Sequence, residues 1–176
     1  MQKQTVIVYR SQTGFTKRYA EQLAGELGCT ALAEKDAKPE QLRGCDTLVF
    51  GTRAHAGRID GLSKGLRLFR QSGAQRLVLF VTGAMPNDAQ KQIDALWTQN
   101  LSVEQLREIP HFYLQGGLCY ERMGWVDRMM MRGLAAMLRS KKNKTDEDTA
   151  LQQAIAVSFD HSDPAYLQPL IDLLRE

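Results

Sequence analysis

The stretch Tyr9-Arg10-Ser11-Gln12-Thr13-Gly14-Phe15-Thr16 lies between an apolar run and a segment of helical character. The run before it, residues 5–9, predicts a buried strand, and residues 16–27 predict a helix. The first turn of a helix has unpaired N–H groups, and the helix dipole adds positive potential there. A turn from a strand into a helix is therefore a place where an anion binds.

The side chains of this stretch strengthen that prediction. Ser11, Thr13 and Thr16 can each donate a hydroxyl hydrogen bond, and Gly14 lets the backbone approach a ligand closely. The spacing is neither GxxxxGK[ST] nor GxGxxG, so neither a Walker loop nor a dinucleotide fingerprint is present. What remains is a site for one terminal phosphate monoester, held by hydroxyls and amides without a cation. The alternative is a hydroxyl-rich turn that only caps the helix.

Strand and helix patterns alternate along the rest of the chain. This alternation predicts a parallel sheet with right-handed crossovers, and five strands suit the order 2-1-3-4-5 in a three-layer α/β sandwich. We expect one domain, residues 1–176. The further predicted strands are 29–33, an edge strand, and 46–52, 76–81 and 111–114, the last of which ends at Gly116-Gly117. The further predicted helices are 61–71, one that Asn87 or Asp88 caps, 102–108, 126–138 and 170–174; the segments 35–44, 53–60 and 82–86 are predicted as loops.

Ser-x-Thr-Gly-x-Thr after the first strand resembles the FMN phosphate loop of the flavodoxin family. The resemblance implies a flavodoxin-like fold and noncovalently bound FMN at the carboxyl ends of the strands. It implies that the phosphate is held by Ser11, Gln12, Thr13, Gly14, Phe15 and Thr16. It also implies that the flavin ring is framed by Thr52, Arg53, Ala54, His55, Ala56 and Gly57, and by Thr82, Gly83 and Ala84.

A narrower resemblance covers residues 49–58, 116–120, 125–130 and 144–146. These segments are similar to those of the flavodoxin-like protoporphyrinogen oxidases that use menaquinone. The resemblance implies an oxidoreductase of heme biosynthesis, in which FMN takes hydride equivalents from a reduced tetrapyrrole and passes them to a quinone. One alternative is an electron-carrier flavodoxin whose partner is a redox protein. Another is an interaction scaffold that has lost FMN.

Charge near the expected ring distinguishes the enzyme from the carrier. Arg53 and Arg58 lie in the second loop with Asp60 as the nearby acid, and positive charge favours the anion of reduced flavin. We therefore expect a flavin tuned to accept electrons, with Arg53, Arg58 and His55 as candidates for substrate binding or flavin tuning and no assigned catalytic residue. The ring loops also lack the Trp or Tyr that carrier flavodoxins stack on the flavin. The alternative is that both arginines point into solvent.

Residues 121–144 carry seven Lys and Arg residues against two acidic ones, with apolar residues interleaved at helical spacing. The favoured interpretation is an ordinary helix packed on the sheet with a solvated basic face. The alternative is a basic amphipathic surface that meets anionic lipid, where a quinone would be available. An acidic partner or the carboxylates of a porphyrin would also suit this charge.

Composition excludes several other classes of protein. The 176 residues are 43% apolar and 24% charged with a net charge of +3, which implies neither disorder nor nucleic-acid binding. No apolar run approaches a membrane span, and the start Met1–Ile7 has no signal-peptide pattern. The cysteine spacing and the absence of HExxH predict no metal site. We therefore expect a cytoplasmic protein, with peripheral contact at the inner face of the membrane as an alternative.

Overall fold

The structure is a computed structural model that describes residues 4–176, so the first three residues of the segment inspected for a signal peptide lie outside the described part. Its main sheet has the order β2-β1-β3-β5-β6, all parallel, and a short strand β4 pairs antiparallel with β3. Counted without β4, this order is the predicted 2-1-3-4-5, which confirms the flavodoxin-like α/β fold class. The strands are β1 (Thr5–Tyr9), β2 (Thr30–Ala33), β3 (Thr47–His55), β4 (Arg58–Ile59), β5 (Arg76–Gly83) and β6 (His111–Gln115).

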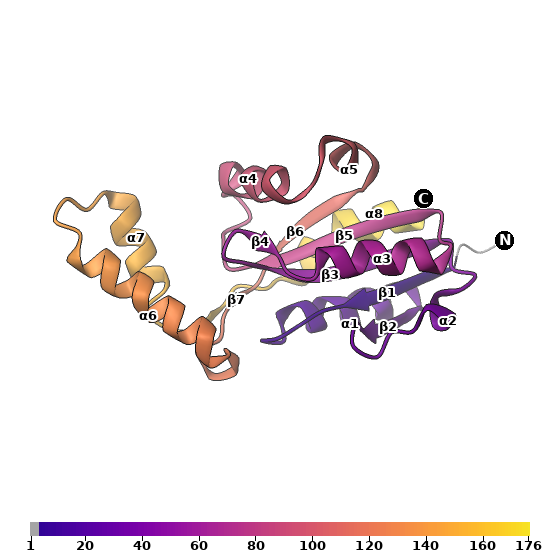
Figure 1. Ribbon diagram of the computed structural model, residues 1–176, viewed down its shortest axis with the longest axis horizontal. Helices are drawn as coiled ribbons and strands as arrows, with labels where there is room; N and C mark the ends of the chain where they lie inside the picture. The colour runs from indigo at the N-terminus through magenta and orange to yellow at the C-terminus, as the bar shows by residue number, and fades with distance from the viewer. Residues whose placement is uncertain (1–3) are drawn as a thin grey trace.

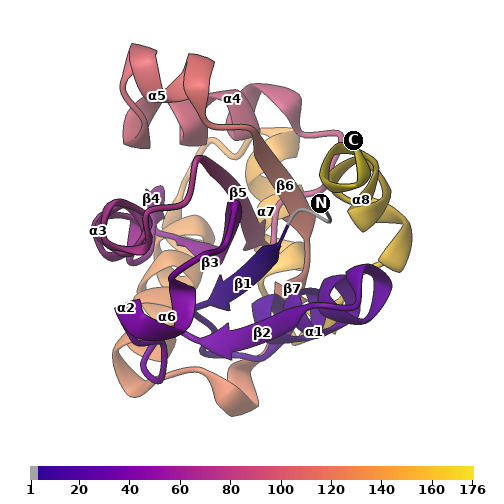
Figure 2. The same cartoon turned by 90° about the vertical axis from the view of Figure 1, so that its right-hand side faces the viewer.

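Helices cover both faces of the sheet (Figures 1 and 2). Alternate residues of each strand face opposite layers, because the strand period is two. Val6 and Val8 thus pack in the layer of α2, α3, α4 and α5, whereas Ile7 packs with α1 and α8. The helices are α1 (Phe15–Leu27), α2 (Pro39–Leu42), α3 (Leu62–Ser72), α4 (Gln90–Asn100), α5 (Val103–Glu108) and α8 (Gln168–Arg175), which the 3₁₀ turn η2 (Pro164–Leu167) precedes.

The predicted loop 53–60 is instead a β-hairpin. Strand β3 continues to His55, which pairs with Arg58 of β4. The two residues between them, Ala56 and Gly57, have φ angles of 48° and 74°. Positive φ at both central residues is the geometry of the turn that matches the twist of a two-residue hairpin. The hairpin extends β3 past Arg53, the last residue that pairs with β5, and it contains the predicted ring loop.

One other predicted boundary was wrong, and the strand predicted as the last is not the last. Neither Asn87 nor Asp88 caps α4, whose N-cap is Ala89; the Asn87 side chain instead accepts a hydrogen bond from the N–H of Gln115 at 2.9 Å. Gly116 follows the end of β6, as predicted, but two short strands come after it: Gly117 begins β7 (Gly117–Leu118), which pairs antiparallel with β8 (Phe159–Asp160). This second ladder ties the segment after β6 to the chain that leads into α8. The short helix α5 begins at the predicted capping box of Ser102 and Gln105.

The helices α6 (Trp125–Ser140) and α7 (Asp146–Ala154) form an arm that extends away from the main sheet (Figure 1). The prediction that the helix at 126–138 packs on the sheet was wrong, because Leu138 is the one buried residue of α6. Large apolar residues on it are exposed, including Trp125 at 78% and Met137 at 60%. The sequence analysis did not predict α7. Within residues 4–176, no helix combines the length and the apolar character needed to cross a membrane.

Candidate functional site

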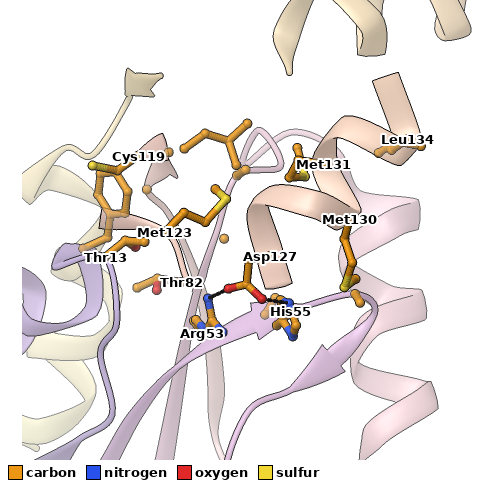
Figure 3. A pocket seen from close by; sticks show the side chains of 18 residues that line it. Thr13, Arg53, His55, Thr82, Cys119, Met123, Asp127, Met130, Met131 and Leu134 are labelled. Carbon is orange, nitrogen blue, oxygen red and sulfur yellow. Dashed lines mark hydrogen bonds and ion pairs between the residues drawn. The ribbon is translucent and has the colours of Figure 1, made fainter. Parts of the chain in front are cut away.

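Three loops meet beyond the carboxyl ends of the parallel strands, where ligands bind in open α/β sheets. They border a cavity of about 440 Å³ that α6 closes from the opposite side (Figure 3). The predicted residues that line it are Thr13, Phe15, Arg53, Ala54, His55, Ala56, Thr82, Gly83 and Ala84. Ser11 and Gln12 line a neighbouring cavity of about 310 Å³ together with Arg10 and Arg53. Thr52 and Gly57 lie outside the lining of the larger cavity.

The first loop has the features of an anion site. Gly14 adopts φ 102°, which L-residues avoid, and its N–H donates to Ser11 Oγ at 3.2 Å. Among the residues that the structure describes, α1 has no acidic residue in its first turn and no side-chain N-cap. Its first N–H groups are thus left for a ligand. Thr13 lines the cavity next to them.

The hydroxyl of Thr16 has a different position from the predicted one. Thr16 is 2% exposed, and its Oγ1 is hydrogen-bonded to Thr82 Oγ1 at 2.7 Å. The side chain therefore points into the core and joins the first loop to the third, because a buried hydroxyl needs a partner within the protein. Its contribution to the loop is its position in the first helical turn and not a hydroxyl directed at an anion.

The other two predicted loops are fixed by buried threonines. Thr52 is fully buried and donates its hydroxyl to the carbonyl of Asp60, which holds the β3–β4 hairpin closed. Thr82 is 3% exposed, and its Oγ1 lies 3.3 Å from the carbonyl oxygen of Thr52. These contacts place Ala54, Ala56, Gly83 and Ala84 at the cavity, and their small size leaves space between the loops.

A charged cluster lies at the mouth of the hairpin (Figure 3). Arg53 Nη1 donates to Asp127 Oδ2 at 3.1 Å, and Arg53 Nε lies 3.3 Å from Asp60 Oδ2. His55 Nε2 lies 3.0 Å from Asp127 Oδ1. Partial burial alone would raise the pKa of Asp60, but the guanidiniums of Arg10 and Arg53 outweigh it and hold that pKa below its usual value.

This cluster changes the predicted charge of the site. Two carboxylates balance Arg53, and one of them, Asp127, comes from α6. Arg58 is exposed and does not line the cavity, which fits the alternative that it points into solvent; its role beside a ring or substrate stays a prediction. The excess positive charge that the sequence predicts beside the ring is therefore absent from the residues that line this cavity.

The opposite wall of the cavity was not predicted from the sequence. Met123, Asp127, Met130, Met131 and Leu134 line the cavity from the segment that leads into α6 and from α6 itself, together with Gly116, Gly117, Leu118 and Cys119. Four of these residues, 127, 130, 131 and 134, have the i, i+3, i+4, i+7 spacing of one helix face. That spacing was the available signal, although it does not tell a cavity wall from a face packed on a sheet. Residues 4–176 hold no group of His, Cys, Asp and Glu placed to bind a metal ion.

Comparisons with known proteins give one family match and several structural matches. A family profile described as "Flavodoxin domain" matches residues 6–148. Similar solved structures include a flavodoxin from the domain Archaea, with 12% identity, 98% of this chain and 99% of that chain covered, and a TM-score of 0.45. A flavodoxin, WrbA-like protein from Agrobacterium tumefaciens has 21% identity, 71% and 87% coverage and a TM-score of 0.41. Rubredoxin oxygen:oxidoreductase from Desulfovibrio gigas has 14% identity, 98% and 36% coverage and a TM-score of 0.46.

No curated protein matches the sequence at a significant level. The family profile alone covers most of the chain, from the first strand through α6 and into α7. It includes the loop with Ser11, Thr13 and Gly14, both ring loops and the opposite wall of the cavity. The chain therefore belongs to the flavodoxin domain family.

Proposed function

We propose that this protein binds FMN in the 440 Å³ cavity and acts as an oxidoreductase like the menaquinone-linked protoporphyrinogen oxidases. The residues present fit the cofactor. Uncapped N–H groups and the Thr13 hydroxyl suit a phosphate, and Gly14 at φ 102° supports a backbone turn that a Cβ would strain. Ala54, Ala56 and the Gly83–Ala84 segment suit the faces and edge of a flat ring.

One observation carries the enzymatic proposal, namely that the cavity has two unlike walls. One wall consists of the three loops that suit FMN, and the other consists of Met130, Met131 and Leu134 of α6. Methionine side chains adapt to irregular apolar and aromatic surfaces. The α6 wall would offer apolar contacts to a substrate beside the flavin, and the macrocycle of a reduced tetrapyrrole is largely apolar. A carrier that only exchanges electrons needs no such second wall.

The residues of the chain would supply the surroundings of the reaction. The α6 wall excludes water from one side of the cavity, which strengthens electrostatic interactions within it. Asp127 Oδ1 lies 3.0 Å from His55 Nε2 and would orient that ring at the cavity. When bound, FMN supplies the two-electron redox chemistry, and the protein binds, orients and tunes it.

An electron carrier is the second candidate function, and the charge cluster favours it. Because Asp60 and Asp127 balance Arg53, no excess of positive charge would raise the potential of a bound flavin. The carrier proposal predicts a low hydroquinone potential and reduction by a redox partner protein. The enzyme proposal predicts direct reduction by the tetrapyrrole.

Anaerobic mixing tests the enzyme proposal. Protein loaded with FMN is mixed with protoporphyrinogen, and the flavin absorbance is followed; a menaquinone analogue is added after bleaching. We expect substrate-dependent bleaching and then recovery of the absorbance, with oxidised protoporphyrin as the inactive control. Protein that dithionite bleaches but protoporphyrinogen does not would contradict the enzyme and leave the carrier. Folded protein that binds no FMN would contradict both.

The exposed face of the arm is the place where we expect the protein to reach its electron acceptor, a quinone. Trp125, Met129 and Met137 are exposed on the same helix as Arg132 and Arg139, which is the composition of a surface that meets anionic lipid. We therefore propose that the arm makes the peripheral membrane contact through which a quinone is reached. Sedimentation with liposomes tests this contact. Binding should require anionic lipid and should be lost on Trp125→Ser with Met129→Ser, and equal binding without anionic lipid would contradict the proposal.

A further inference from the structure

The segment Cys119–Trp125, here called the strap, crosses the first loop on its way to α6. A Cβ placed on Gly14 would lie 2.9 Å from Arg122 Nη1. A Cβ placed on Gly124 would lie 2.9 Å from Gln12 Nε2. The strap therefore contacts the first loop at two points, and the guanidinium of Arg122 lies against the N-cap of α1.

The strap is held in this position by its own polar contacts. Arg128, in the first turn of α6, donates to the carbonyls of Tyr120 and Met123. The hydroxyl of Ser158 accepts from the N–H of Tyr120 at 3.0 Å. These bonds fix the backbone on both sides of Arg122. The fixed backbone directs the Arg122 side chain toward Gly14.

The charge of Arg122 differs from that of the arginines around it. Arg18 lies 2.8 Å from Asp160, Arg10 lies 3.0 Å from Glu34, and Arg53 has two carboxylate partners. Within residues 4–176, no ion pair or side-chain hydrogen bond involves the guanidinium of Arg122, which is exposed. Arg122 is thus a cation that the fold directs at the first loop without neutralising it.

The place that Arg122 approaches is already positive. The N-terminus of α1 carries the positive end of the helix dipole, and its first turn contains no acidic residue. Two positive potentials face each other here, which is unfavourable unless an anion lies between them. An arginine matches the geometry of a phosphate, because its fork of N–H donors binds two oxygens at once.

We propose that Arg122 contacts the phosphate of FMN and supplies the cation that the sequence motif of the first loop lacks. This inference rests on the proposed binding of FMN. It makes the strap a second half of the phosphate site, contributed from a part of the chain about a hundred residues beyond the loop. It also makes FMN binding selective over riboflavin, which has the same ring and no phosphate.

Flavin titrations test the proposal. Dissociation constants for FMN and for riboflavin are measured by quenching of flavin fluorescence, on apoprotein of the wild type and of Arg122→Gln, Arg122→Lys and Arg107→Gln. Arg107 is also exposed but lies on α5 and has no part in the proposed site or in the arm, so its variant removes the same charge as a matched control. Circular dichroism confirms that each variant is folded.

A charge-assisted hydrogen bond is lost in Arg122→Gln, so the dissociation constant for FMN should rise roughly 10- to 100-fold. The constant for riboflavin should stay within about twofold, because its binding involves no phosphate contact. Arg122→Lys should give an intermediate constant for FMN, and Arg107→Gln should match the wild type. The wild-type affinity for FMN should also fall more steeply with salt than that of Arg122→Gln.

The outcomes separate this inference from the function on which it rests. If the wild type binds FMN and Arg122→Gln binds it equally well, the role of Arg122 is wrong and the proposed function stands. If Arg122→Gln weakens FMN and riboflavin to the same extent, the strap is structural and the phosphate contact is wrong. If the folded wild type binds neither flavin, both the inference and the proposed function fail.

Discussion

Substitution of Asp127 by Asn should release the arm from the rest of the protein. Asp127 is the carboxylate of α6 that contacts both Arg53, at 3.1 Å, and His55, at 3.0 Å. Leu138 is the one buried residue of α6, so polar contacts at the first turn of the helix supply much of its attachment. The variant keeps the size of the side chain and removes its charge.

The size of the expected destabilisation follows from the burial of the ion pair between Asp127 and Arg53. The side chains of Asp127 and Arg53 are 12% and 18% exposed, between a surface pair worth about 0–1 kcal/mol and a buried pair whose disruption costs about 3–5 kcal/mol. Arg53 retains Asp60 as a partner, which reduces the loss. We therefore expect the free energy of opening of the arm to fall by about 1–2 kcal/mol in Asp127→Asn, which corresponds to a roughly 5- to 30-fold change in the opening equilibrium.

Hydrogen exchange measures this opening directly. Amides of α6 should exchange roughly 5- to 30-fold faster in Asp127→Asn, while amides of β5 in the centre of the sheet should keep their wild-type rates. Asp88→Asn is the matched control, because Asp88 is exposed and forms no ion pair with any residue that the structure describes. Unchanged exchange in α6 would refute the anchoring role of Asp127, and faster exchange throughout the sheet would refute the local nature of the opening.

Three further substitutions test the packing and charge of the core. Gly65→Ala should lower the free energy of unfolding by about 1–3 kcal/mol, because a Cβ there would lie 2.5 Å from Cδ1 of Phe50. The control Gly25→Ala should be neutral or stabilising, because a Cβ at that position meets nothing within 4 Å. Equal urea midpoints for the two variants would contradict this prediction. Thr16→Val should cost about 1–2 kcal/mol through its buried hydrogen bond, and an unchanged urea midpoint would count against that bond. Asp60→Asn should be less stable than the wild type at neutral pH, because the native pKa of Asp60 lies below its usual value of 3.8. This stabilisation is present above pH 3.8 and is lost as the pH falls through the native pKa, so a stability gap that does not narrow as the pH falls below 3.8 would contradict it.

Local patterns in the sequence were enough to predict the sheet. Each main strand is an apolar run bounded by turn residues, and alternation with helices fixes a parallel order. The first loop was also predictable, because its residues are contiguous and their chemistry is local to one helix terminus. The hairpin at 53–60 was missed because Ala56-Gly57 is a weaker turn signal than Asn-Gly, and the pairing of His55 with Arg58 extends β3 beyond its apolar run.

The second half of the site depends on approaches between distant segments. Nothing in the sequence near Gly14 indicates that Arg122 lies against it, and nothing near Arg53 indicates that Asp127 balances its charge. The apolar spacing of α6 predicts an amphipathic helix correctly, but the same spacing suits a sheet-packed helix, a cavity wall or an exposed surface. The charge of a site therefore cannot be summed from the loop that carries its motif.

Equilibrium titration of folded apoprotein with FMN tests the central claim most directly. We expect saturable binding of one FMN per chain, with quenched flavin fluorescence. Thr13→Val should weaken this binding roughly 10- to 100-fold, because one hydrogen bond to a charged phosphate is lost. Folded protein that does not bind FMN would contradict the account. So would a Thr13→Val variant that binds FMN as tightly as the wild type does, together with a wild type from which riboflavin displaces FMN as effectively as FMN itself.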